Sequence, residues 1–186
     1  MKKSHLGVIL GLVLILLIVG YIVFRVIKQE TVVVADKESH FSNFATTTAE
    51  FTTVTGESFT PEFTKSDKLT LVVSWASWSP YTPDEFSTIS RLREIYSEDE
   101  LDIVTLNRKE TPEQIARFIK TYPLPDNVQS IVDVNDTYYK AISGFSMPES
   151  ILYGRSGEII FHQRSELQFE VVASIISENL PLTVEN

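Results

Sequence analysis

The order of apolar segments between residues 69 and 106 constrains the fold more than any other feature of the chain. Leu69–Trp75 is an uncharged run, rich in β-branched residues and of the length of a buried strand, and Leu101–Leu106 is a second strand candidate. Between them, residues 84–96 place apolar side chains at helical spacing, with charged side chains on the remaining positions. The pattern predicts a strand–helix–strand unit, the usual building block of an α/β sheet.

Further predicted elements continue this alternation. A second helix is predicted to begin after Thr111 as N-cap, with Pro112 at the first helical position and Gln114 completing a capping box. The other patterns predict a hairpin over 51–59, strands over 128–134, 149–153 and 158–161, and helices over 135–142 and from residue 165. This order predicts an α/β fold with a mixed central sheet and helices on both faces.

The first 50 residues have a different character. Leu6–Phe24 is an uncharged stretch of 19 residues, close to the roughly 20 that a helix needs to cross a bilayer. A cleaved signal peptide has a shorter apolar region, of about 7–15 residues, followed by a small-x-small cleavage site that Tyr21–Arg25 does not offer. The sequence therefore predicts a short tail over 1–5, a transmembrane signal-anchor helix over 6–27, a tether over 28–50 and a domain over 51–182.

The charges indicate where that domain lies. Lys2 and Lys3 favour a cytoplasmic N-terminus, although Arg25 and Lys28 lie on the other flank of the apolar stretch. The chain has a net charge of −9; residues 1–30 carry +3 and the rest therefore −12. An acidic domain binds polyanions poorly, so nucleic acid is not an expected partner. We expect a single-pass protein of the cell membrane whose domain is extracytoplasmic, in a periplasm or outside the cell.

The chain contains no cysteine. This excludes disulfides, thiolate metal sites and every thiol nucleophile or redox couple. His5, His40 and His162 are scattered and show no metal-binding spacing, and there is no glycine-rich phosphate loop. We therefore expect neither a metal nor another cofactor.

The segment that joins the first strand to the first helix is the most informative. It reads Trp-Ala-Ser-Trp-Ser-Pro-Tyr-Thr-Pro-Asp-Glu-Phe over Trp75–Phe86. It resembles the active-site segment of membrane-anchored thioredoxin-like proteins of the TlpA/ResA family, W-A-x-W-C-x-x-C followed three residues later by Glu. Ser79 and Thr82 stand at the two cysteine positions, and Glu85 stands at the position of the acid.

A second segment supports this resemblance. Gly144–Pro148 precedes a strand and then a turn at Gly154–Gly157, which is similar to the family's cis-proline loop and hairpin, although the family usually has Asp where Gly154 stands. The resemblance covers about residues 51–180. It implies a thioredoxin-like fold and a cis peptide bond between Met147 and Pro148.

The family's reaction is thiol–disulfide exchange, and this chain cannot perform it. A serine hydroxyl forms no mixed disulfide, and a helix dipole worth about 0.3–1 kcal/mol does not ionise it. The chain is thus interpreted as a degenerate member that lacks redox activity. Ser79 and Thr82 are interpreted as helix caps, with Thr82 and Glu85 forming a capping box; the family's proton-handling role for Glu85 is the less favoured reading. A hydrolase is not favoured, since Ser79 has no histidine predicted within reach.

What remains is a binding surface. In thioredoxin-like folds, the groove beside the active-site loop and the cis-proline binds extended polypeptide. Trp75 is expected in the core. The predicted binding residues are Trp78, Pro80, Tyr81, Glu85, Met147 and Pro148. We expect a protein-binding, scaffolding or chaperone-like module with a protein or peptide partner; the alternatives are an enzyme of the same superfamily with a non-thiol reaction and a purely structural subunit of an envelope complex.

Overall fold

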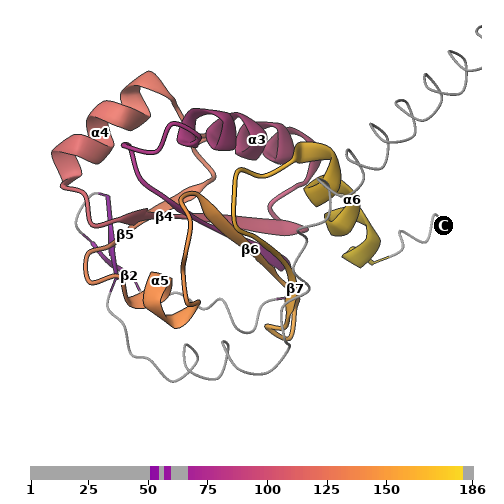
Figure 1. The fold of residues 1–186 in the computed structure, drawn as a ribbon. Helices are drawn as coiled ribbons and strands as arrows, with labels where there is room; N and C mark the ends of the chain where they lie inside the picture. Colours follow the sequence, from indigo (N-terminus) through magenta and orange to yellow (C-terminus); the bar gives the residue numbers. More distant parts are fainter. Residues whose placement is uncertain (1–50, 55–56, 60–66, 182–186) are drawn as a thin grey trace, which may run out of the picture. The chain divides into compact units, whose positions relative to one another are not determined.

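The computed structural model of the chain describes residues 51–54, 57–59 and 67–181 (Figure 1). The predicted tail, membrane anchor and tether, over 1–50, lie outside these residues. Within the described ranges, no helix combines the length and the apolar composition needed to cross a membrane.

Seven strands form one mixed sheet in the order β2-β1-β5-β4-β3-β6-β7. The pairs β3–β4 and β4–β5 are parallel, and the others are antiparallel. The strands are β1 (Phe51–Thr53), β2 (Ser58–Phe59), β3 (Leu69–Trp75), β4 (Leu101–Arg108), β5 (Gln129–Asp133), β6 (Glu149–Tyr153) and β7 (Ile159–Gln163). The mixed sheet predicted from the sequence is confirmed.

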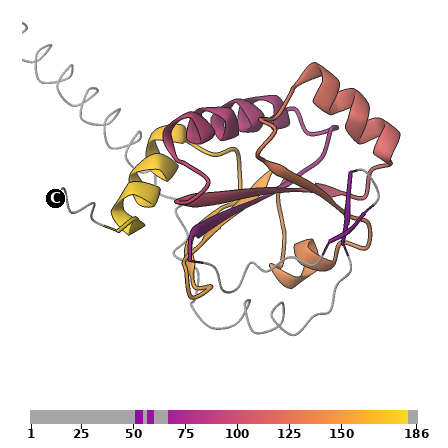
Figure 2. The ribbon, with the colours of Figure 1, turned by 180° about the vertical axis from the view of Figure 1, so that it is seen from behind.

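Helices cover both faces of this sheet, as predicted. They are α3 (Thr82–Ile95), α4 (Pro112–Thr121), α5 (Thr137–Ala141) and α6 (Phe169–Asn179). Figures 1 and 2 show α3, α4 and α6 on one side and α5 on the other. The alternation of side chains along each strand explains this division: Leu71 and Val73 of β3 pack with the three-helix side, while Val72 between them packs with α5.

Aromatic rings fill the core beneath α3 and α4. Trp75, at the end of β3, is fully buried, as expected from the sequence. Its ring centroid lies 4.8 Å from that of Phe86 on α3 and 5.4 Å from that of Phe118 on α4. Burial of a large apolar side chain contributes about 1.5–3 kcal/mol, so these rings fix both helices over the carboxyl end of β3.

The start of α4 follows the sequence prediction. The Thr111 hydroxyl accepts a hydrogen bond from the Gln114 amide, and the Gln114 side chain accepts one from the Thr111 amide. Other boundaries differ. Helix α3 begins at Thr82, two residues before the predicted start, and α6 begins at Phe169 rather than at residue 165.

The strand order brings two loops to one edge of the sheet. β3 lies between β4 and β6, and Ser74 near the end of β3 pairs with Glu149 at the start of β6. The loop that leaves β3 and the loop that enters β6 therefore lie next to each other. These are the two segments that the sequence analysis singled out.

Candidate functional site

A hydrogen bond joins the loop after β3 to the loop before β6, and the second of these loops contains the predicted cis peptide bond. The Ser79 hydroxyl donates to the Met147 carbonyl oxygen at 2.9 Å. The Met147–Pro148 peptide is cis, which confirms the expectation from the sequence. The bond spans 68 residues of sequence, so it fixes the position of one loop against the other.

Both residues at the cysteine positions are buried and satisfied by backbone carbonyls. Ser79 is 2% exposed and Thr82 is fully buried. The Thr82 hydroxyl donates to the Ala76 carbonyl oxygen at 2.8 Å, across the turn that opens α3. Each hydroxyl proton is thus engaged within the protein, and neither oxygen is placed as a nucleophile.

The predicted capping box at Thr82 is wrong. Thr82 is the first residue of α3, the N-cap is Tyr81, and no side chain caps the helix. Ser79 comes nearest to a capping role, since its hydroxyl oxygen accepts a long hydrogen bond of 3.4 Å from the Tyr81 amide. A turn from Ala76 to Ser79 already leads the backbone into the helix. Helix α3 therefore begins earlier than predicted, and Glu85 lies too far along it to bond back to the N-cap residue.

Glu85 lies inside the protein instead. Its carboxylate accepts a hydrogen bond from the Ser150 hydroxyl on β6 at 2.7 Å and one from the Leu167 amide, before α6, at 2.6 Å. Burial raises the pKa of Glu85 to about 7 against the opposing effect of these two hydrogen bonds, and the nearby Glu166 raises it further. The side chain therefore joins α3, β6 and the segment before α6, and its protonation changes around neutral pH.

A polar network that the sequence analysis did not identify holds the start of the β3–α3 loop. The Glu110 carboxylate accepts hydrogen bonds from the Ser77 amide at 2.6 Å and from the Ser77 hydroxyl. The Asn107 side-chain amide donates to the same carboxylate at 2.7 Å. The loop is consequently fixed at Ser77 from β4 and at Ser79 from the neighbouring loop.

A second unidentified network fixes the loop before β6. The buried Glu149 carboxylate accepts hydrogen bonds from the Phe145 amide at 2.8 Å and the Ser146 amide at 3.1 Å. His162 lies 2.6 Å and Arg164 3.3 Å from the other carboxylate oxygen. Burial acts to raise the pKa of Glu149, but the His162 hydrogen bond and the two amides outweigh it and hold the pKa below its usual range.

The predicted binding residues divide into exposed and buried groups. Trp78 is 64% and Tyr81 52% exposed. Pro80 is also exposed and Met147 is half-buried, whereas Glu85 and Pro148 are buried and lie beneath the surface. The two loops thus present Trp78, Pro80, Tyr81 and part of Met147 to solvent.

Phe145 is an exposed residue that the sequence analysis did not single out. At 85%, it is the most exposed large hydrophobic side chain of the described residues. It lies two residues before Met147, in the Gly144–Pro148 segment that carried the family resemblance. Apolar side chains at strand-like or helical spacing are expected in the core, but an isolated Phe in a loop carries no such signal, so its exposure was not predictable from the pattern.

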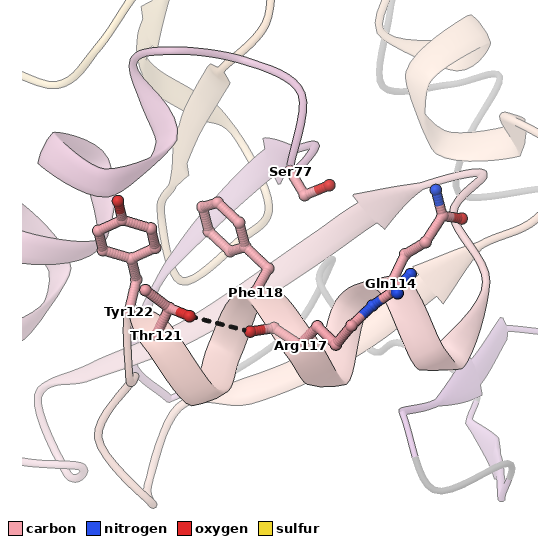
Figure 3. Close-up of a pocket in the computed structure, with 6 residues that line it drawn as sticks. All are labelled: Ser77, Gln114, Arg117, Phe118, Thr121 and Tyr122. Atoms are coloured by element: carbon pink, nitrogen blue, oxygen red, sulfur yellow. Dashed lines mark hydrogen bonds between the residues drawn. The ribbon is translucent and has the colours of Figure 1, made fainter.

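An open groove of about 320 Å³ runs along α4 beside the β3–α3 loop (Figure 3). In this view the Phe118 ring lies between Ser77 and Tyr122, and its centroid lies 5.0 Å from that of Tyr122. The lining residues are Ser77, Gln114, Arg117, Phe118, Thr121 and Tyr122. Ligand pockets are about 300–1,000 Å³ in volume, so this groove lies at the small end of that range.

Ser79 and His162, the two side chains that could support acyl transfer, are each engaged elsewhere. Acyl transfer requires a nucleophile with a base in reach, but the buried Ser79 donates to a carbonyl and the buried His162 pairs with Glu149. In residues 51–54, 57–59 and 67–181, no three histidine or acidic side chains gather as they would around a metal ion.

Known proteins were compared with this chain at three levels. No protein-family model matches the sequence, and no curated protein matches it. Solved structures do match. The dsbF structure of MTB aligns with a TM-score of 0.61 at 15% identity, covering 70% of this chain and 93% of that one.

Other similar structures have the same thioredoxin-like fold. StoA from Bacillus subtilis has a TM-score of 0.57 at 20% identity, covering 68% of this chain and 94% of that one. A thiol-disulfide oxidoreductase from Bacteroides fragilis has a TM-score of 0.58 at 19% identity, covering 70% of this chain and 95% of its own. The chain therefore has a thioredoxin-like fold, similar to that of thiol-disulfide oxidoreductases, and it contains no cysteine.

Proposed function

We propose that this protein is a membrane-anchored, extracytoplasmic relative of the TlpA/ResA proteins that has lost thiol redox activity and binds another protein through its former active-site edge. The observation that carries the proposal is the pairing of two fixed loops with exposed aromatic side chains. Trp78 and Tyr81 are more than half exposed, while Ser79 between them is buried and bonded to Met147.

The rigid backbone makes these exposed rings a binding surface. Ordering a loop on binding opposes association, so a surface fixed in advance binds more tightly. Here Ser77 is held by Glu110, and Ser79 is held by Met147. Aromatic side chains are enriched at protein interfaces, where they contribute large contact areas at a small loss of side-chain entropy.

The proposed location rests on Leu6–Phe24, whose length and lack of charge suit a bilayer-spanning helix. Similar structures are those of oxidoreductases, and one of them is described as secreted. The alternative functions make different demands on this surface. A purely structural subunit would not need Trp78 and Tyr81, whereas an enzyme would need a reactive group on this edge.

Site-specific photocrosslinking in intact membranes tests the proposal. A p-benzoylphenylalanine at Tyr81 should crosslink the full-length protein to another polypeptide. The matched control places the same group at Ile95, which is 57% exposed and lies at the opposite end of α3. Equal yields at both positions, or none at position 81, would count against a binding role for this edge.

A further inference from the structure

The edge that carries the exposed aromatic side chains also contains strained backbone. Three non-glycine residues of the described ranges have positive φ angles: Lys109 (61°) after β4, Asp136 (55°) after β5 and Ser143 (52°) before β6. Because β3, β4 and β5 are parallel, the turns after β4 and β5 lie at the same edge of the sheet as the β3–α3 loop. A left-handed conformation costs such residues free energy and persists only where the surrounding structure holds it. The contacts around these turns are therefore candidates for shaping the edge.

Asp136 holds two cations at this edge. Its side chain is 3% exposed, and its carboxylate accepts two hydrogen bonds from the Arg108 guanidinium, at 2.8 and 3.1 Å, and pairs with the Lys109 ammonium at 2.6 Å. A bidentate pair fixes the orientation of a guanidinium as well as its position. The Arg108 Cζ atom lies 3.9 Å from the centroid of the Tyr139 ring, within the roughly 6 Å over which a cation is attracted to an aromatic face.

Tyr139 connects this arrangement to the loop before β6. Its hydroxyl donates a hydrogen bond to the Ser146 carbonyl oxygen at 2.8 Å. A Cβ atom at Gly144 would overlap its ring, so the ring lies directly against the loop backbone. The same loop is bonded to the Glu149 carboxylate through the Phe145 and Ser146 amides. The exposed Phe145 side chain is therefore presented by a backbone that Tyr139 helps to fix.

From these contacts we infer that Tyr139 is a positioning residue of the proposed binding edge, held by Arg108 and fixing the loop that presents Phe145 to the protein partner. This inference rests on the proposed function and adds the loop before β6 to the surface that binds the partner. Tyr139 is 7% exposed, so it acts through the loop rather than by touching the partner.

The neighbouring Tyr138 provides a matched comparison on the same helix. Its hydroxyl bonds to the Tyr153 hydroxyl at 2.8 Å inside the core, and both side chains are buried. Replacing either Tyr138 or Tyr139 by Phe removes a hydroxyl and retains the ring. Only the change at Tyr139 removes a bond to the loop, so a merely structural role would make the two variants alike.

Hydrogen exchange of the full-length protein and photocrosslinking in intact membranes together test the inference. Loss of one hydrogen bond changes an equilibrium constant about fivefold. Tyr139→Phe should therefore raise the exchange rate of the Phe145 and Ser146 amides about fivefold, and should lower the crosslinking yield of p-benzoylphenylalanine at position 145 by a similar factor. Arg108→Gln should act in the same direction, and Tyr138→Phe should change neither quantity.

The other outcomes are distinguishable. Equal effects of Tyr138→Phe and Tyr139→Phe, or parent-like exchange of the loop amides in Tyr139→Phe, would overturn the inference. If exchange rises while the yield at position 145 stays unchanged, the loop does not belong to the binding edge, and the inference fails while the proposed function stands on position 81. Absence of crosslinks from both positions in the parent protein would refute the proposed function as well.

Discussion

Glu85 is a carboxyl group whose surroundings disfavour its charge. It is fully buried and held by two hydrogen bonds, and burial raises its pKa from 4.5 to about 7. A pKa that is higher in the folded than in the unfolded protein favours folding most strongly when the group is protonated. The stability contributed by Glu85 is therefore complete below about pH 4.5 and declines as the pH rises through 7.

Replacing Glu85 by Gln should remove this pH dependence. The amide can accept from Leu167 and donate to Ser150, and it has no charge to bury. We expect Glu85→Gln to stabilise the protein at pH 9 by about 1–3 kcal/mol and to have little effect at pH 4.5. Urea unfolding at both pH values measures this, with Glu94→Gln as an exposed control on the same helix. Equal destabilisation at both values would contradict it.

Ser79 and Thr82 allow a direct test of the relation to thiol enzymes. They lie three residues apart at the start of α3, and the Thr82 amide donates to the Ser79 carbonyl at 3.3 Å. Cysteines at a helix start have lowered pKa values and oxidise readily. The double variant Ser79→Cys, Thr82→Cys should form an intramolecular disulfide under mild oxidant, measured by alkylation and mass spectrometry.

The cysteine-free background makes that test unambiguous. Each single variant should keep an alkylatable thiol under the same conditions. A folded double variant that retains two free thiols would show that the two positions are not juxtaposed as in the oxidoreductases.

At the scale of elements, the loop before β6 depends on one buried carboxylate. Glu149 connects the Phe145 and Ser146 amides to His162 and Arg164. Removing one partner of a buried charged network costs about 3–5 kcal/mol. Because its pKa is lowered in the folded protein, the stability that Glu149 contributes is present above the unfolded pKa and is lost as the pH falls.

Glu149→Gln should therefore destabilise the protein at pH 7 by about 2–4 kcal/mol, and the difference from the parent protein should shrink toward pH 3. Thermal unfolding across this range measures it. Glu158→Gln, in the turn before β7, is the matched control and should show a smaller effect. A difference that does not change with pH would mean that the charge of Glu149 is not what holds the loop.

The elements also show what could be predicted from the sequence. β3 and β6 have the predicted bounds, and the α4 capping box forms as expected, because each depends on a local pattern. The start of α3 differs from the prediction because the turn from Ala76 to Ser79 leads into the helix early. The start of α6 differs because the Leu167 amide bonds to the Glu85 carboxylate, 82 residues away, and lies outside the helix. The groups that bond to Glu110 and Glu149 come from several segments, so no local pattern revealed either network.

For the whole molecule, the proposed anchor raises the question of its orientation in the membrane. The proposal that the acidic domain is extracytoplasmic rests on the family resemblance, because basic residues flank the long uncharged stretch on both sides. Charge alone therefore does not decide the topology, and a direct measurement is needed.

Single cysteines can measure the topology without background, since the natural chain contains none. Ser87 is exposed on α3, and Ser4 lies in the proposed cytoplasmic tail. In intact cells, a membrane-impermeant maleimide should label Ser87→Cys, and should label Ser4→Cys only after permeabilisation. The reverse pattern would place the domain in the cytoplasm. The labelling pattern therefore decides in which compartment the partner must be sought.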